Sequence, residues 1–219
     1  MEYIHNTEQF QFHNTVVALG KFDGMHKGHQ LIFDELIKYK EMGYQAAVFS
    51  FDRPPLNMLK HKHMRVIYTT NEKIKLLARR GIDIYIEHPF TDEFSHLSPE
   101  DFVIKVLLEK TGMKVLVVGD DCGFGYKRQG NVELLERMSK EYDFKLIVIP
   151  KLELEGEIVS STRIRHLLSE GKVEEANRLM EDPFMICGSV VHGNHMGAEV
   201  LQMPTANQIP LEDKLLPPN

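Results

Sequence analysis

Five short apolar segments alternate along the chain with longer stretches in which hydrophobic residues recur at helical spacing. The apolar segments are residues 15–19, 46–51, 82–87, 115–119 and 145–150. All except 82–87, the weakest of them, are continuous apolar runs that stop beside glycine, aspartate or proline. Runs of this length and continuity are typical of strands buried on both faces of a sheet, so the pattern predicts five buried strands.

The stretches between these segments carry signals that begin and end helices. Amphipathic patterns occupy residues 29–43, 71–81, 98–112 and 131–142. Gly43, Gly81 and Gly112 stand where a left-handed residue closes a helix. Ser98 followed by Pro99 is a helix cap with proline at the first helical position. The sequence therefore predicts four helices, each between two strands.

Strands that alternate with helices predict an α/β fold, in which helices cover both faces of a parallel sheet. The pattern changes near Asp182. Residues 162–180 predict two short helices split at Gly171, and residues 184–193 predict a strand followed by a glycine-rich loop. The 37 residues from Pro183 onward are too few to bury a core of their own. We expect an α/β unit over residues 1–182 and a short β-type segment over residues 183–219, which either opens a second domain or docks on the first.

Composition and charge narrow the classes of partner. Hydrophobic content of 42% and charged content of 26% are those of an ordinary globular protein. The formal net charge of −6 argues against nucleic acid and membrane surfaces, since both call for basic patches. The sequence shows neither a signal-peptide pattern nor an apolar run long enough for a membrane span, and Cys122 and Cys187 lie far apart. We expect a cytoplasmic protein with reduced thiols that acts on small molecules.

Residues that carry chemistry gather first at the turn after the first predicted strand. His26 and His29 lie three residues apart, on one helical turn. Such a strand-to-helix turn presents free N–H groups and the positive end of a helix, which suits an anion. Two imidazoles there would bind phosphate oxygens and, when protonated, offset charge on a transferring phosphorus. Three glycines would let the ligand approach the backbone: Gly20, Gly24 and Gly28.

Two other interpretations of this turn stay open. Histidines three apart can chelate a metal ion, although no third ligand stands at an obvious spacing. They can also be surface residues without a role, as we take His61 and His63 to be. The H-x-G-H pattern is too short to decide between these alternatives alone.

A second polar group precedes the first of the two short C-terminal helices. Ser160, Ser161 and Thr162 stand where hydroxyl groups cap helix amides and also meet phosphate oxygens. Arg165 follows on the same helix face, and its guanidinium group could clamp a phosphate at two points. Taken alone, the segment is better explained as a helix cap beside a surface arginine.

Together the two segments resemble the nucleotidylyltransferase superfamily, whose Rossmann-like members join ATP or CTP to a phosphate-bearing substrate. The similarity is closer to one family in it. Four motifs occur in the order found in bifunctional riboflavin kinase/FAD synthetases: GKFDGMHKGHQ, VVGDDCGFGYKRQGNVELL, VSSTRIRHLLSEGKVEEANRLM and PTAN. The similarity covers roughly residues 15–210, and four ordered motifs make chance agreement improbable.

The resemblance implies that residues 1–182 form an FMN adenylyltransferase domain with a Rossmann-like nucleotidylyltransferase fold. ATP, with Mg²⁺ on its phosphates, and FMN would be the substrates, and FAD and pyrophosphate the products. No residue is expected to bind a metal directly. The residues implied to bind the phosphates and stabilise the transition state are His26, His29, Ser161, Thr162 and Arg165. Those implied to surround the nucleotide are Gly20, Phe22, Asp23, Gly24, Gly28, Asp121 and Ser160.

Two motifs that the family places near the flavin are altered here. In the family motif G-x-D-F-R-F-G, this chain has Cys122 and Gly123 in place of the aromatic and the arginine. The motif F-D-P-H-P reads FDRPP. The resemblance leaves Asp52, Arg53 and Phe124 as candidates for FMN binding, with Arg53 as a replacement contact for the FMN phosphate.

The last segment resembles an incomplete riboflavin kinase. Thr205 and Asn207 match positions that the family uses around MgATP. An Arg-Gly-Arg run is missing, Gln202 stands where glycine is usual, and the rest of the kinase with its catalytic acid is absent. We expect FMN adenylyltransferase activity without riboflavin kinase activity. The alternatives are a related nucleotidylyltransferase with another phosphate acceptor, and a non-catalytic flavin- or nucleotide-binding module.

Overall fold

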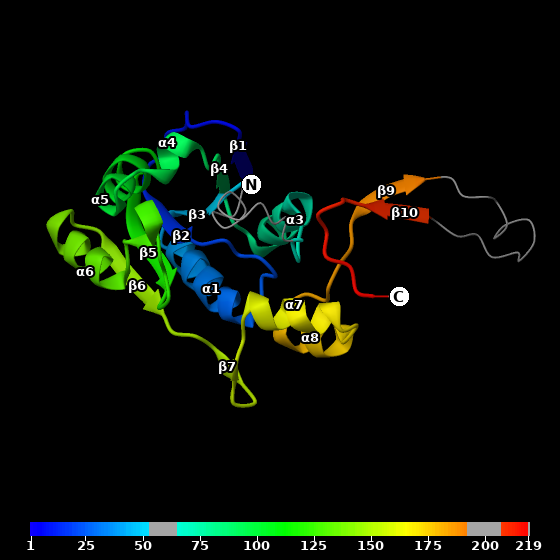
Figure 1. Cartoon of the computed structure of the whole chain (residues 1–219). Helices are drawn as coiled ribbons and strands as arrows, with labels where there is room; N and C mark the ends of the chain where they lie inside the picture. Colours follow the sequence, from blue (N-terminus) through cyan, green and yellow to red (C-terminus); the bar gives the residue numbers. More distant parts are fainter. Residues whose placement is uncertain (53–64, 192–206, 219) are drawn as a thin grey trace, which may run out of the picture.

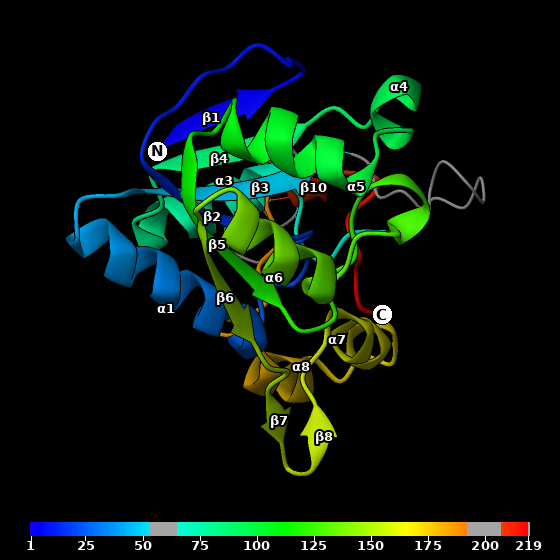
Figure 2. The same ribbon diagram turned by 90° about the vertical axis from the view of Figure 1, so that its left-hand side faces the viewer.

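A computed structural model of the chain describes residues 1–52, 65–191 and 207–218 (Figures 1 and 2). Its centre is a six-stranded sheet in the order β1-β4-β3-β2-β5-β6, and every neighbouring pair is parallel. The strands are β1 (Glu2–His5), β2 (Thr15–Leu19), β3 (Gln45–Phe51), β4 (Ile84–His88), β5 (Met113–Gly119) and β6 (Lys145–Ile149). The predicted α/β class with a parallel sheet is confirmed.

All five predicted strands are present. The weakest candidate became β4, which is buried at every position between β1 and β3. The edge strand β1 was not predicted from the sequence. Its four residues are exposed or half-buried, so it lacks the continuous apolar run that marks the inner strands.

The helices follow the predicted pattern, with one change of geometry. Gly81 closes α3 with a left-handed φ of 88°, and Ser98 caps the helix that begins at Pro99. That predicted helix is α5 only as far as Asp101 and then continues as a π-helix, η1. The helical elements are α1 (Lys27–Glu41), α3 (Thr70–Arg80), α4 (Asp92–Ser95), α5 (Pro99–Asp101), η1 (Phe102–Leu108), η2 (Tyr126–Arg128), α6 (Val132–Glu141), α7 (Ser161–Ser169) and α8 (Val173–Leu179).

Two apolar clusters sandwich the sheet, because successive strand residues point to opposite faces. Val16 and Ala18 of β2 face a cluster formed with α1, α3, α7 and α8. Val17 and Leu19 face a second cluster formed with η1 and α6. The parallel sheet is therefore covered on both sides (Figure 2), as parallel sheets require.

The strand order fixes where a ligand is expected. From β2 the chain moves outward through β3 to β4 on one side, and β5 and β6 lie on the other side. The order therefore reverses between β2 and β5. In open parallel sheets, ligands bind beyond the carboxyl ends of the strands at such a reversal. Here that place is the turn between Leu19 and α1.

The chain beyond β6 adds small elements to this frame. A hairpin of β7 (Glu153–Leu154) and β8 (Glu157–Ile158) leads into α7, and neither strand was predicted. After α8, β9 (Gly188–Val191) pairs antiparallel with β10 (Asn207–Pro210), which agrees with the expected β-type segment. In Figure 1 this pair extends to one side of the molecule, and the chain after it turns back toward α3 and α8.

Two glycines with left-handed backbones give a matched test of packing. Gly112 has a φ of +62°, and a Cβ added there would meet the Phe12 carbonyl group and the His13 Cα atom, the latter at 2.7 Å. Gly43 has a φ of +96° with no heavy atom within 4 Å of such a Cβ. We expect Gly43→Ala to cost about 1–2 kcal/mol from backbone strain alone. Gly112→Ala should cost a further ~1–3 kcal/mol from overpacking.

Urea unfolding of the two variants and the unmodified chain measures this difference. Equal losses in the free energy of unfolding would show that the close approach of residues 12 and 13 to Gly112 is not a constraint on the fold.

Candidate active site

His26 and His29 lie face to face at the start of α1. His26 is the N-cap residue, and its Nδ1 atom accepts a hydrogen bond from the His29 amide at 3.3 Å. The two rings stack with centroids 3.6 Å apart and planes 19° apart. The turn thus brings two imidazoles together beside the free amides of a helix N-terminus, an arrangement suited to an anion.

The shape of this turn depends on residues that pack against the imidazoles. Phe22 is only 3% exposed and meets His29 edge to face, with ring centroids 5.2 Å apart. A Cβ on Gly20 would approach the Phe22 ring to 2.8 Å, and one on Gly28 would approach His26 Nδ1 to 3.2 Å. Phe22 was expected to line the nucleotide pocket and Gly28 to leave space for the ligand. In the structure Phe22 packs against His29, and the His26 ring lies beside Gly28; both residues stay candidates for the nucleotide pocket.

Burial keeps both imidazoles neutral at neutral pH. Desolvation lowers the pKa of His26 to about 4, against smaller opposing effects of Asp23 and Asp121. Desolvation, and to a smaller extent electrostatic repulsion from His26, lowers the pKa of His29 well below its usual value. Because neutral His26 accepts at Nδ1, its proton is on Nε2, which makes that atom a donor.

The His29 ring also carries an unsatisfied atom. Its Nδ1 is buried and has no hydrogen-bond partner within the described residues. Buried polar atoms in folded proteins are nearly always paired with protein or water, so an unpaired one is a place where a ligand or water molecule would bind.

Asp23 joins this turn to the second polar segment. It is 4% exposed, and its Oδ1 accepts hydrogen bonds from the amides of Ile67 at 3.0 Å and Tyr68 at 3.3 Å. Its Oδ2 pairs with the Arg165 guanidinium group. Its backbone carbonyl accepts from the Ser161 hydroxyl group, 138 positions away in the sequence. The two segments singled out from the sequence therefore meet at one place.

The start of α7 supplies the hydroxyl groups and Arg165. Ser160 is the N-cap, and its hydroxyl accepts from the Arg163 amide at 3.2 Å. Thr162 is exposed, and the Arg165 side chain is 19% exposed. Arg163 points elsewhere, as expected, and pairs with Glu157 of the β7–β8 hairpin at 2.7 Å.

Asp121 follows β5, on the other side of the strand-order reversal. Its side chain is exposed and pairs with Lys151 at 3.2 Å. Its charge acts on the His26 pKa, which places it near the imidazole pair. The position fits a residue close to the nucleotide.

Two of the three candidates for FMN binding lie in the described residues. Phe124 is 6% exposed and packs against Phe102 on the α6 face of the sheet. Asp52 is exposed at the end of β3, where it accepts from the Phe90 amide at 2.9 Å. Arg53 lies outside the described residues.

Of the two kinase-like residues, only Asn207 lies in the described part of the chain. Thr205 lies outside the described residues, and Asn207 is exposed at the start of β10.

Lys21 is a cation at this site that the sequence analysis did not single out. Desolvation lowers its pKa, Asp23 opposes that effect, and the positive charges of Arg165 and Lys73 add to it. Lys21 precedes Asp23 by two residues on the same turn. Its position inside the GKFDG part of the first motif is the signal that could have identified it.

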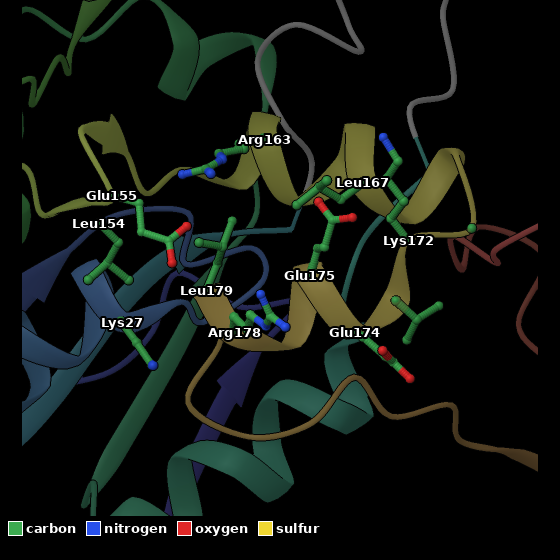
Figure 3. A pocket seen from close by; sticks show the side chains of 12 residues that line it. Lys27, Leu154, Glu155, Arg163, Leu167, Lys172, Glu174, Glu175, Arg178 and Leu179 are labelled. Carbon is green, nitrogen blue, oxygen red and sulfur yellow. The ribbon is translucent and has the colours of Figure 1, made fainter.

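A cavity of about 830 Å³ lies on the other side of α7, between α8, the β7–β8 hairpin and the first residue of α1 (Figure 3). Its charged lining is mixed and comprises Lys27, Glu155, Arg163, Lys172, Glu174, Glu175 and Arg178. It contains none of the residues expected to bind phosphate, so it adjoins the candidate site without being part of it.

Three further observations concern only the described parts of the chain. They contain no group of three or more His, Cys, Asp or Glu side chains that could hold a metal ion. No helix there is both long and apolar enough to cross a bilayer. Cys122 and Cys187 are both free thiols.

Sequence comparison assigns the family. Residues 8–163 match the FAD synthetase family, and residues 180–219 match the riboflavin kinase family. Since the first match covers most of the chain, the protein belongs to the FAD synthetase family. The predicted resemblance is confirmed, and so is the nucleotidylyltransferase-like fold.

Individual relatives agree with this assignment. The chain is 39% identical to a bifunctional riboflavin kinase/FMN adenylyltransferase of Buchnera aphidicola (93% of this chain, 66% of the relative). It is 32% identical to an FAD synthetase of Listeria monocytogenes (86% of this chain, 77% of the relative). The chain thus spans about two thirds of the length of the bifunctional relatives it matches.

One solved structure is also similar. A crystal structure described as a macrolide-efflux protein from Streptococcus pneumoniae is 31% identical, with a TM-score of 0.84. The match covers 98% of this chain and 70% of that one.

The His26 pKa predicts how stability depends on pH. The unfolded chain binds a proton at His26 near pH 6.5, whereas the folded chain does so only near pH 4. The stabilisation is complete above pH 6.5 and is lost as the pH falls to 4. The loss is about 3 kcal/mol, at 1.36 kcal/mol per pH unit.

His26→Asn tests this assignment, because asparagine can still cap α1 but doesn't titrate. We expect urea unfolding curves of the variant to show a smaller loss of stability between pH 6.5 and 4 than those of the unmodified chain. Parallel pH profiles would contradict the assignment.

Proposed function

We propose that this chain is an FMN adenylyltransferase, which transfers AMP from ATP to FMN and releases pyrophosphate. The observation that carries the proposal is the junction at Asp23 of the imidazole pair with Ser161 and Arg165, beside the strand-order reversal. Membership of the FAD synthetase family supports the same activity. The alternative, in which His26 and His29 chelate a metal ion, is not supported by a third ligand among the described residues.

The reaction needs placement and charge neutralisation more than covalent help. An oxygen of the FMN phosphate forms a bond to the α-phosphorus of ATP, and the bond between that phosphorus and the bridging oxygen to the β-phosphate breaks. The electron pair leaves with pyrophosphate. The protein must therefore hold two anionic substrates in line and stabilise the charge that develops on the leaving group.

The imidazole pair and the α1 N-terminus would hold the α-phosphate. The Nε2–H of His26 and the unsatisfied ring of His29 would each make a new hydrogen bond with a phosphate oxygen. The negative charge of a phosphate group raises the pKa of a neighbouring imidazole. Bound ATP would therefore allow these rings to take up protons that the free protein excludes.

The start of α7 would hold the β- and γ-phosphates. Ser161 and Thr162 lie at the first helical positions, where the backbone amides and the Thr162 hydroxyl would face an anion, while the Ser161 hydroxyl donates to the Asp23 carbonyl. Arg165 would provide two parallel N–H donors, and Asp23 would keep the guanidinium group in place. Gly20, Gly24, Asp121 and Ser160 are proposed to border the nucleotide.

MgATP is proposed as the nucleotide form, with Mg²⁺ shielding the phosphate charge as the pyrophosphate leaves. Asp23 is an unsuitable ligand, because both of its oxygens already bind protein groups. The metal would reach the site on the phosphates.

We further propose that residues 1–182 form the adenylyltransferase domain and residues 183–219 a riboflavin-kinase-like segment. Of the FMN candidates, Asp52 follows β3 at the carboxyl edge of the sheet, and Arg53 and Phe124 are kept from the motifs that carry the family resemblance. The kinase-like match covers residues 180–219, which have no Arg-Gly-Arg run and carry Gln202 where the family usually has glycine. The 219-residue chain is therefore proposed to lack riboflavin kinase activity.

The direct test incubates the purified chain with FMN and MgATP and follows FAD by chromatography and pyrophosphate by a coupled assay. We expect FAD, and His29→Asn should lower kcat about 10²–10³-fold, the usual cost of losing a group that stabilises the transition state. His166→Asn is the matched control, since His166 is an exposed residue on α7 and should leave kcat unchanged.

The alternatives have distinct outcomes in the same assay. Riboflavin in place of FMN should yield no FMN, and its appearance would contradict the proposed lack of kinase activity. Turnover only with another phosphate acceptor would point to a related nucleotidylyltransferase. Binding of FMN and ATP without pyrophosphate release would point to a non-catalytic module.

A further inference from the structure

The chain after β10 returns to the adenylyltransferase domain and inserts a buried lysine (Figure 1). Lys214 is 1% exposed and forms a parallel bridge with Val66. The Val66 amide donates to the Asp213 carbonyl at 2.7 Å, and the Leu215 amide donates to the Val66 carbonyl at 2.8 Å. A segment assigned to the kinase-like part thus adds a short strand-like contact to residues that follow β3 in the chain.

The Lys214 ammonium group is fully satisfied. It donates to Glu72 Oε2 at 2.7 Å, to the Ile67 carbonyl at 2.6 Å and to the Met185 carbonyl at 2.7 Å. The rings of Phe184 and Tyr68 lie 4.4 Å and 4.9 Å from it. An ammonium group has three donors, and all three have acceptors here. A buried charge is tolerated only when paired in this way.

Glu72 is equally buried and fixes the other side of the pair. Its Oε1 accepts from the Cys187 amide at 2.7 Å, and its Oε2 accepts from the Thr69 amide at 2.8 Å as part of the capping box of α3. The pair therefore joins three separate segments: the start of α3, the residues before β9, and the residues after β10.

The same contacts continue into the candidate active site through the backbone carbonyl and amide groups of Ile67. The Ile67 carbonyl accepts from Lys214, and the Ile67 amide donates to Asp23 Oδ1 at 3.0 Å. Asp23 Oδ2 in turn pairs with Arg165. Arg165 Nε also donates to the Arg65 carbonyl at 3.4 Å, in the same stretch of chain. Residues 65–68 thus contact Lys214 on one side and the phosphate-binding residues on the other.

We propose that Lys214 is a positioning residue for ATP binding, acting through residues 65–68 and Asp23 on Arg165. The kinase-like segment is then part of what makes the adenylyltransferase site competent. This inference rests on the proposed function for its kinetic readout, but not for its binding readout.

The test is a double-mutant cycle. Lys214→Met keeps the length of the side chain and removes its charge, and Lys214→Met/Glu72→Gln also removes the partner charge so that no carboxylate is left buried alone. Each is made in the unmodified chain and in Arg165→Ala. Titration calorimetry with a non-hydrolysable ATP analogue measures affinity, and FAD formation measures KM and kcat.

We expect the Lys214 variants to weaken binding of the analogue at least tenfold and to raise the KM for ATP more than the KM for FMN. In the Arg165→Ala background the same changes should have little further effect, because the residue through which Lys214 acts is already gone. Affinity unchanged by both Lys214 variants, or equal losses in both backgrounds, would overturn the inference.

Lys40→Met is the matched control. Lys40 also joins a carboxylate and a carbonyl, Asp83 Oδ1 at 2.6 Å and Gly81 at 2.7 Å, but at the amino edge of the sheet. It should lower the melting temperature without changing the affinity for the analogue. Equal losses of affinity in the Lys40 and Lys214 variants would show a general stability effect and contradict the positioning role.

The two proposals fail separately. If the unmodified chain binds the analogue but forms no FAD, the proposed function fails while the cycle still tests Lys214. If it forms FAD and the Lys214 variants bind ATP normally, only the positioning role fails.

Discussion

The buried carboxylate of Asp23 is the interaction on which the candidate site depends. A carboxylate at 4% exposure is stable only when its oxygens are paired, and here they bind two backbone amides and a guanidinium group. Removing one partner of such a pair typically costs 3–5 kcal/mol, because the other charge is left buried alone. Asp23 therefore does more than add charge: it fixes where the turn after β2 meets α7.

Under the proposed function, this arrangement would let a protein of net charge −6 hold a triphosphate. Among the described residues, the positive groups near the two neutral imidazoles include Lys21, Arg165 and the α1 N-terminus. Because burial keeps those imidazoles uncharged in the free protein, the site does not accumulate positive charge before the ligand arrives. The phosphate itself would complete their hydrogen bonding and favour their protonation.

The inner strands and most helices could be predicted because local signals decide them: continuous apolar runs, capping residues and glycine at helix ends. The edge strand β1 and the β7–β8 hairpin could not be predicted. These strands are short and their residues are exposed or half-buried, so only pairing with a partner strand defines them. The co-location of His26 with Arg165 followed from a family resemblance rather than from spacing. Contacts across the fold decided the rest, including the burial of Phe124, the packing of Phe22 against His29, and the burial of Lys214 beside Glu72.

The most direct measurement is kcat/KM for FAD formation by Asp23→Asn, with circular dichroism to confirm that the variant is folded. Asparagine keeps the volume and one carbonyl acceptor but removes the charge that holds Arg165. If the net charge of the site alone decided ATP binding, the variant would have the higher kcat/KM, because removing the Asp23 charge makes the site more positive. Positioning by Asp23 predicts a loss of at least about tenfold, on the scale of a misplaced catalytic group. An unchanged or higher kcat/KM in the folded variant would contradict it.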